Sequence, residues 1–133
     1  MLLQNLYIGF FMKYFLSLMT LLLALVLFTG CTRVDDETLR AAHSAVDRGA
    51  VIIDVRTTKE YTQKHVSGAL NIPVEEISKS VARVPRGKEL VIYCASGNRS
   101  AHATVVLRQK GWTVFDVATQ GDFERKLPPL KIK

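Results

Sequence analysis

The chain has 133 residues and a formal net charge of +6, from 18 basic and 12 acidic side chains. This length accommodates one domain with a modest core. No run of basic residues is longer than two and no aromatic stripe accompanies the basic residues, which argues against a nucleic-acid-binding surface. We interpret the basic excess as a mild attraction for anions and membrane surfaces.

The N-terminal segment differs in composition from the rest of the chain. Residues 14–30 carry no charge, Lys13 precedes them, and every acidic residue follows position 31. A positive residue, an apolar stretch and then small residues are typical of a secretory signal. As a transmembrane span the segment is marginal, because crossing a bilayer takes about 20 apolar residues. The sequence predicts a signal peptide over residues 1–30, with Met12 as the true start or residues 1–11 as a dispensable extension.

The end of this segment, LFTGC, resembles a bacterial lipoprotein signal. Thr29 and Gly30 fit the small positions before the modified cysteine, whereas Phe28 replaces the usual leucine. The resemblance implies lipidation of Cys31, a tether over residues 31–37 and a lipid anchor on the periplasmic side of the cell envelope. Thr32 replaces the aspartate associated with inner-membrane retention, which weakly favours the outer membrane. The alternative is an uncleaved anchor helix with an incidental cysteine.

Strand and helix patterns alternate through the rest of the chain. Thr57 and Glu60 have the spacing of a capping box, which predicts a short helix after the first strand. Apolar periodicity predicts helices over residues 36–50 (ending at Gly49), 57–65, 74–84 and 100–110, with a last helical turn from 121. Apolar or β-branched runs predict strands over residues 50–55, 68–73, 89–94 and 112–117. This order predicts an α/β domain over residues 38–126 with a mainly parallel sheet, followed by a tail over 127–133.

The strand over residues 89–94 ends on Cys94, at the sheet edge where ligands of parallel α/β sheets bind. Ala95, Ser96 and Gly97 are small, so the backbone can curl and direct several N–H groups inward. A helix follows, and its N-terminus favours negative charge. These donors, with Arg99 nearby, are expected to lower the pKa of the Cys94 thiol and to hold an anionic substrate.

Cys94 allows four interpretations: a buried hydrophobe, half of a disulfide, a metal ligand or a nucleophile. If Cys31 carries lipid, Cys94 has no intramolecular disulfide partner. Zinc is disfavoured because one cysteine and three scattered histidines show no ligand spacing. A buried hydrophobe and a reactive thiol therefore remain, and no metal is expected.

The spacing from Cys94 to Arg99 is C-x4-R, one residue shorter than the C-x5-R loop of cysteine-dependent phosphatases. This shorter loop resembles that of the rhodanese family. Three further segments carry the resemblance, which covers roughly residues 38–126: IIDVRTTKEY, HVSGALNIP and GWTVFDVATQG. The chain is most similar to the small secreted members with a single domain. Two residues depart from the family pattern, because Lys64 and Gln120 each stand where glycine is usual.

The resemblance implies a three-layer α/β/α fold with a sheet of four to five strands, in a monomer without cofactor. It implies that the Cys94 thiolate takes a sulfur atom from thiosulfate or a similar donor, forms a persulfide and passes the sulfur to cyanide or a thiol. The substrate would be held by the remaining loop residues, namely Ala95, Ser96, Gly97, Asn98, Arg99 and Ser100.

Several polar residues outside the loop are expected to be structural. The family pattern implies that Asp54 and Arg56 support the fold, with Arg56 paired to Glu60, and that His65 fixes a loop by hydrogen bonding. His43 and His102 belong to no motif.

Two other functions remain open. A non-catalytic binding module of the same fold could dock a partner at the membrane, although such members commonly lose the cysteine that is intact here. A phosphatase or arsenate reductase is disfavoured by the short loop, and hydrolysis of a chromogenic phosphate ester would favour it.

Overall fold

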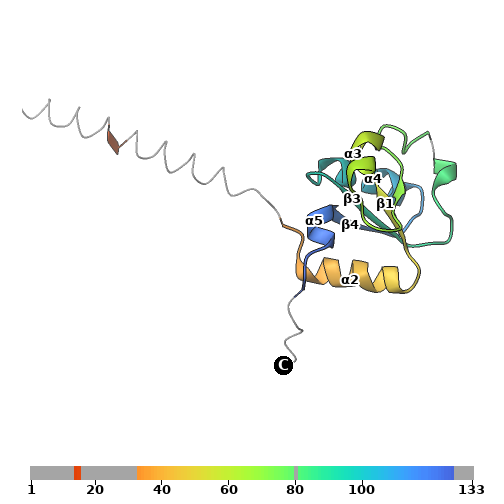
Figure 1. Cartoon of the computed structure of the whole chain (residues 1–133), viewed down its shortest axis with the longest axis horizontal. Helices are drawn as coiled ribbons and strands as arrows, with labels where there is room; N and C mark the ends of the chain where they lie inside the picture. Colours follow the sequence, from red (N-terminus) through yellow and green to blue (C-terminus); the bar gives the residue numbers. More distant parts are fainter. Residues whose placement is uncertain (1–13, 16–32, 80, 128–133) are drawn as a thin grey trace, which may run out of the picture. The chain divides into compact units, whose positions relative to one another are not determined.

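The computed structural model describes residues 14–15, 33–79 and 81–127 (Figure 1). The chain divides into two units, residues 1–32 and 33–133. Most of the expected signal peptide and the expected lipidation site, Cys31, lie outside the described residues, as does most of the tail. In the described part of the chain, no helix is long and apolar enough to cross a membrane.

Four parallel strands form the sheet of the second unit in the order β2-β1-β3-β4. Their bounds are β1 (Val51–Asp54), β2 (Leu70–Asn71), β3 (Leu90–Cys94) and β4 (Val114–Thr119). β3 lies between β1 and β4, and all five of its residues are buried. The predicted parallel α/β sheet is therefore confirmed, and its central strand ends on Cys94.

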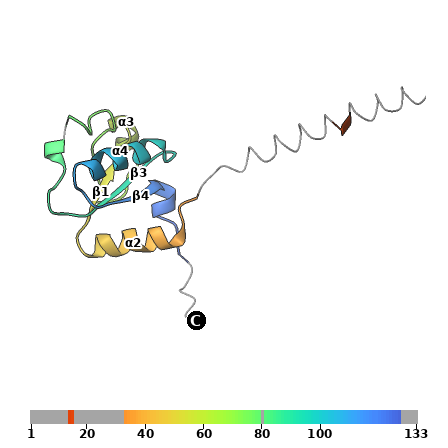
Figure 2. The ribbon, with the colours of Figure 1, turned by 180° about the vertical axis from the view of Figure 1, so that it is seen from behind.

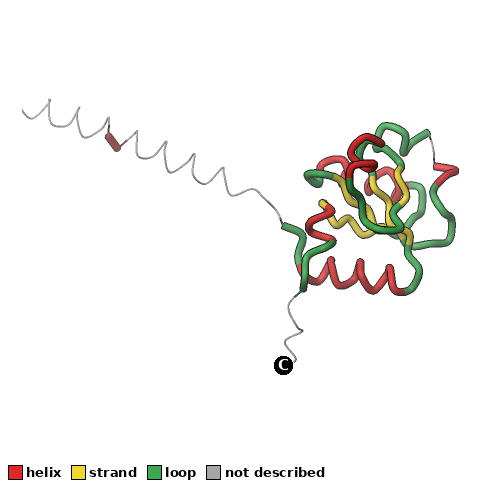
Figure 3. The backbone as a smooth tube through the Cα atoms, in the orientation of Figure 1, coloured by secondary structure: helices red, strands yellow, loops and turns green. Residues whose placement is uncertain are grey.

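Helices cover both faces of this sheet. They are α2 (Asp36–Asp47), α3 (Thr58–Gln63), α4 (Asn98–Gln109) and α5 (Gln120–Phe123), with a 3-10 turn, η1, at Val81–Arg83. Views from opposite sides show α2 and α4 flanking the strands (Figures 1 and 2). The same layering is visible when the tube is coloured by secondary structure (Figure 3).

The alternation of side chains along each strand divides the core into two layers. Ile52 and Tyr93 pack with Leu39 of α2, whereas Ile53 and Ile92 belong to the cluster that includes α4. Apolar side chains are needed on both faces because each face is covered by a helix. This two-sided burial explains the continuous apolar runs that predicted β1 and β3.

The predicted helix over residues 74–84 is wrong. Residues 74–79 form successive turns, in which Ile77 N–H donates to the Val74 carbonyl at 3.3 Å, before η1 begins. Ile77 and Val84 are nevertheless buried in the core. The prediction failed because apolar residues spaced by three or four positions fit consecutive turns as well as an α-helix.

Several element boundaries also differ from the predicted ones: β2 covers only Leu70–Asn71 of the predicted 68–73, and β4 and α4 are shifted along the chain. β4 covers residues 114–119 and not 112–117, because Trp112 packs in the core and its Nε1–H donates to the Pro85 carbonyl at 3.0 Å. α4 begins at Asn98, two residues earlier than predicted, after a left-handed N-cap at Gly97 with φ 91°. Arg99 therefore lies in the first turn of α4.

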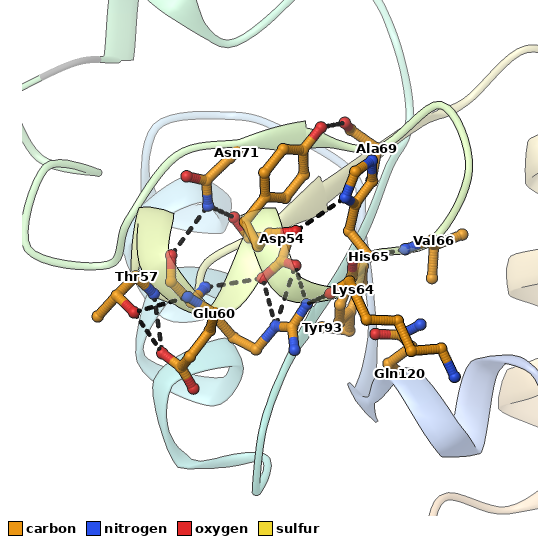
Figure 4. A network of polar contacts seen from close by, with 12 residues as sticks. Asp54, Thr57, Glu60, Lys64, His65, Val66, Ala69, Asn71, Tyr93 and Gln120 are labelled. Carbon is orange, nitrogen blue, oxygen red and sulfur yellow. Dashed lines mark hydrogen bonds and ion pairs between the residues drawn. The ribbon is translucent and has the colours of Figure 1, made fainter.

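A buried ion pair fixes the chain where it leaves β1. The Asp54 side chain is fully buried and accepts hydrogen bonds from Arg56 Nε at 3.0 Å and Nη2 at 2.6 Å (Figure 4). Asn71 Nδ2 donates to the carbonyls of both residues, at 3.0 and 2.9 Å. The Arg56 guanidinium also lies 5.5 Å from the ring centroid of Tyr93, the residue before Cys94. These contacts therefore hold the segment that follows β1 against the carboxyl end of β3.

We expect Asp54→Asn to lower the free energy of unfolding by about 3 kcal/mol, because it leaves the Arg56 guanidinium without its buried counter-charge. Urea unfolding measures this loss. Glu76→Gln is the matched control, since the Arg83–Glu76 pair has side chains 57% and 50% exposed, and its loss should cost less than about 1 kcal/mol. Equal effects of the two substitutions would contradict the role given to the Asp54 pair.

Candidate active site

Cys94 lies where β3 passes into the loop before α4, and it is 1% exposed. The Gly97 N–H donates to the Cys94 Sγ, with nitrogen and sulfur 3.1 Å apart. In the thiol form the Cys94 Sγ donates to the Ser100 Oγ at 3.7 Å, and the Ser100 hydroxyl donates to the Gly97 carbonyl at 2.9 Å. When Cys94 is ionised, the same hydroxyl can rotate to donate to the sulfur. The sulfur thus faces hydrogen-bond donors at the N-terminus of a helix, where negative charge is favoured.

The pKa of Cys94 is set by two opposing effects. Burial raises the pKa of the thiol, but the backbone N–H groups of Ser96, Ser100 and Gly97 and the Ser100 hydroxyl lower it by stabilising the thiolate. The net shift is downward from the ordinary value of 9.0. A larger fraction of Cys94 is therefore thiolate near neutral pH, and thiolate is the nucleophilic form of cysteine.

An irregularity in β4 packs against the loop that follows Cys94. The pairing of β3 with β4 shifts register between Ile92 and Cys94. There Ala118 has a φ of 55°, and its N–H donates to the Asp116 Oδ1 at 2.9 Å. A Cβ at Gly97 would lie 3.3 Å from the Ala118 Cβ, so little room remains between loop and strand. Gly97 is needed there both for its positive φ and for this close approach.

Arg99 pairs with Glu60. Its Nη1 and Nη2 donate to the two carboxylate oxygens of Glu60, each at 2.8 Å. Hydrogen bonds from Arg99, followed by those from Thr57, hold the pKa of Glu60 well below its usual range. The expected pairing of Arg56 with Glu60 is wrong, because Arg56 is engaged by Asp54, two residues away. Glu60 therefore ties α3 to the first turn of α4.

The predicted loop residues divide into two groups around the sulfur. Gly97 and Ser100 contact Cys94 directly, as given above. Ala95, Ser96 and Asn98 have exposed side chains, so their closest link to the sulfur is through the loop backbone. The catalytic role of Cys94 and the substrate-binding role of Arg99 and the other loop residues remain predictions.

Two of the three histidines, His43 and His65, make structural contacts. His65 Nδ1 lies 2.9 Å from the Tyr61 carbonyl, and the two rings stack with centroids 3.8 Å apart. His43 Nε2 lies 2.8 Å from the Phe123 carbonyl, while His102 is exposed on α4. Among the described residues, no group of three or more potential ligands is placed to hold a metal ion.

Sequence reasoning missed the contacts that support the loop from outside. Glu60 was expected to form a capping box, which the structure confirms, and to pair with Arg56, but its ion-pair partner Arg99 lies on a helix 39 positions away. Asp116 and Ala118 gave no sequence signal, because a bulge in β4 depends on its pairing with β3. Lys64 and Gln120 were noted only as departures from a pattern.

Comparisons with known proteins agree with this geometry. Residues 38–120, more than half of the chain, match the rhodanese-like domain. Thiosulfate sulfurtransferase PspE of Escherichia coli is 41% identical over 63 residues, which cover 46% of this chain and 61% of PspE. A sulfurtransferase of Allochromatium vinosum is 33% identical over 79 residues, which cover 59% of this chain and 73% of that protein.

The fold comparison gives the same result. The crystal structure of a rhodanese-related protein from Thermoplasma volcanium has a TM-score of 0.58 and 28% identity, covering 68% of this chain and 91% of that one. The match to PspE spans less than two thirds of that relative's length. Similarity therefore establishes the domain and its fold.

Replacing Ser100 tests the origin of the lowered Cys94 pKa. We expect Ser100→Ala to raise the pKa of Cys94, because the thiolate loses a hydroxyl donor. The pH profile of iodoacetamide alkylation, followed by mass spectrometry of the Cys94 peptide, should have its midpoint below 9.0 in the unmodified protein. It should move to higher pH in Ser100→Ala but not in the control Ser44→Ala, whose serine is exposed on α2. Identical profiles for all three proteins would contradict this assignment.

Proposed function

Since the chain belongs to the rhodanese-like domain family, we propose that it is a sulfurtransferase that carries sulfur as a persulfide on Cys94. The supporting observation is the position of the Cys94 sulfur. It lies at the carboxyl end of β3, receives the Gly97 N–H at 3.1 Å and has a lowered pKa. This arrangement supplies a thiolate together with donors for the negative charge of a persulfide.

In the first half-reaction the Cys94 thiolate attacks the outer sulfur of thiosulfate. A new sulfur–sulfur bond forms to Cys94 while the bond between the two sulfur atoms of thiosulfate breaks. Its electron pair leaves with sulfite. One thiolate and one thiosulfate dianion thus become one persulfide anion and one sulfite dianion, so that no proton, oxidant or cofactor is needed.

In the second half-reaction a nucleophilic acceptor attacks the outer sulfur of the persulfide. Cyanide leaves as thiocyanate, or a thiolate leaves as a new persulfide, and the Cys94 thiolate is regenerated. The negative charge of the regenerated thiolate is then stabilised by the same N–H groups that stabilised the persulfide. Because these donors are fixed by the backbone of the loop and of α4, they need no rearrangement between the two steps.

We propose further that the domain works outside the cytoplasm, anchored by lipid on Cys31. The support comes from the sequence: the uncharged segment over residues 14–30, with Lys13 before it and small residues at its end. Signal cleavage before Cys31 would leave a short tether ahead of α2.

Mass spectrometry of the intact chain tests the sulfur-transfer step. After treatment with thiosulfate, the peptide containing Cys94 should gain the mass of one sulfur atom, and cyanide should remove it as thiocyanate. Cys94→Ser should abolish both the adduct and turnover. Cys31→Ser is the matched control, since it removes the other cysteine of the chain and should leave both unchanged. Absence of an adduct in the unmodified chain, or hydrolysis of a phosphate ester in its place, would refute the proposal.

Metabolic labelling with a radioactive fatty acid tests the anchor. Expressed in Escherichia coli, the full chain should incorporate label and fractionate with membranes. Cys31→Ser should lose the label, whereas Cys94→Ser should keep it. An unlabelled chain that still fractionates with membranes would instead support the uncleaved anchor helix.

A further inference from the structure

The two residues that depart from the family pattern contact the same carboxylate. Lys64 Nζ lies 3.6 Å from the Glu124 Oε2, and Gln120 Nε2 donates to the Glu124 Oε1 at 2.7 Å. Lys64 follows α3, and Gln120 begins α5. In the close-up, Lys64 and Gln120 lie on the same side of the polar network, next to the α5 ribbon (Figure 4). We call these three residues the Lys64 bridge.

Neither residue is explained by a special backbone conformation. Lys64 has a φ of −164°, which is extended backbone open to any residue. Gln120 occupies the first position of a helix and is buried. Because glycine is not required at either position, what these residues add is their side chains and the contact with Glu124.

The Lys64 bridge lies at the same end of the sheet as Cys94. The Lys64 carbonyl accepts from Arg56 Nη2 at 2.6 Å, which fixes the Lys64 backbone beside the exit of β1. Gln120 directly follows Thr119, the β4 residue that pairs with Cys94. Since β3 lies between β1 and β4, the Lys64 bridge joins the segments that follow the two strands flanking β3, at the end of the sheet where Cys94 lies.

The segments that follow β1 and β3 carry the cations Arg56, Lys64 and Arg99. Their ion pairs differ in length and in exposure to solvent. Arg56 makes a 2.6 Å contact with a fully buried carboxylate, and Arg99 is held by both oxygens of Glu60 at 2.8 Å. The Lys64 pair is longer, at 3.6 Å, and its side chains are 74% and 43% exposed. Exposed ion pairs of this kind contribute little and are easily exchanged.

From this difference we propose that Lys64 binds the anionic sulfur donor at the mouth of the Cys94 site, exchanging Glu124 for the donor's oxygens. Gln120 keeps its hydrogen bond to Glu124 in the exchange, so the carboxylate is not left without a partner. An ammonium group suits this role, because it is a compact charge on a flexible stem that can follow the ligand. This inference rests on the proposed sulfur transfer and assigns one donor-binding residue to it.

Steady-state kinetics with thiosulfate and a saturating acceptor test the proposal. Lys64→Gln should raise the KM for thiosulfate about five-fold at low ionic strength and leave kcat within about two-fold, because it removes binding and not chemistry. Glu124→Gln should lower the KM, since it frees the ammonium group. Lys64→Arg should retain a KM close to that of the unmodified protein. The difference between Lys64→Gln and the unmodified protein should shrink as salt is added.

The matched control is Lys110→Gln, which removes the same charge from an exposed position at the far end of α4. It should leave the KM unchanged. A turnover-competent protein in which Lys64→Gln and Lys110→Gln have the same KM would overturn this inference while leaving the sulfurtransferase proposal intact. Lack of turnover by the unmodified protein would instead overturn both. Lys64→Gln should unfold in urea like the unmodified protein, because its side chain is largely exposed.

Discussion

The hydrogen bonds that converge on the Cys94 sulfur are the constraint on which the rest of the site depends. A buried thiol by itself would resist ionisation, yet the pKa of Cys94 is lowered because burial is outweighed by backbone N–H groups and the Ser100 hydroxyl. These donors are available because a strand ends and a helix begins within four residues, between Cys94 and Asn98. The left-handed Gly97 makes this abrupt change of direction sterically possible.

The surrounding structure holds this turn in place from two sides. On one side, the Asp54–Arg56 pair fixes the exit of β1 against Tyr93, and Glu60 reaches from α3 to Arg99. On the other side, the bulge in β4 brings Ala118 beneath Gly97. The charges of the two arginines are largely compensated by carboxylates. Both arginines therefore also hold the backbone, and the proposed role of Lys64 in binding the donor stands beside the predicted roles of Arg99 and the loop N–H groups.

The sequence predicted the layered fold and the position of Cys94 because both depend on local patterns. Continuous apolar runs identified β1 and β3, and the C-x4-R spacing identified the loop. Partner choice was not predictable, because Glu60 could pair with Arg56 or Arg99, and only the fold brings the loop arginine within reach. The helix predicted over residues 74–84 was wrong for a different reason, because apolar residues at this spacing fit turns as well as helices. The contact of Lys64 with Glu124 likewise arises only when the segments after β1 and β4 come together, whereas Gln120 and Glu124 are only four positions apart.

The most direct measurement is a high-resolution crystal structure of the protein after treatment with thiosulfate. One additional sulfur atom bonded to the Cys94 Sγ, within hydrogen-bonding distance of the loop N–H groups and without change in the Glu60–Arg99 pair, is the predicted result. An unmodified Cys94 in protein that has been shown to react with thiosulfate, or sulfur bound at another residue, would contradict the central claim that this loop carries a persulfide.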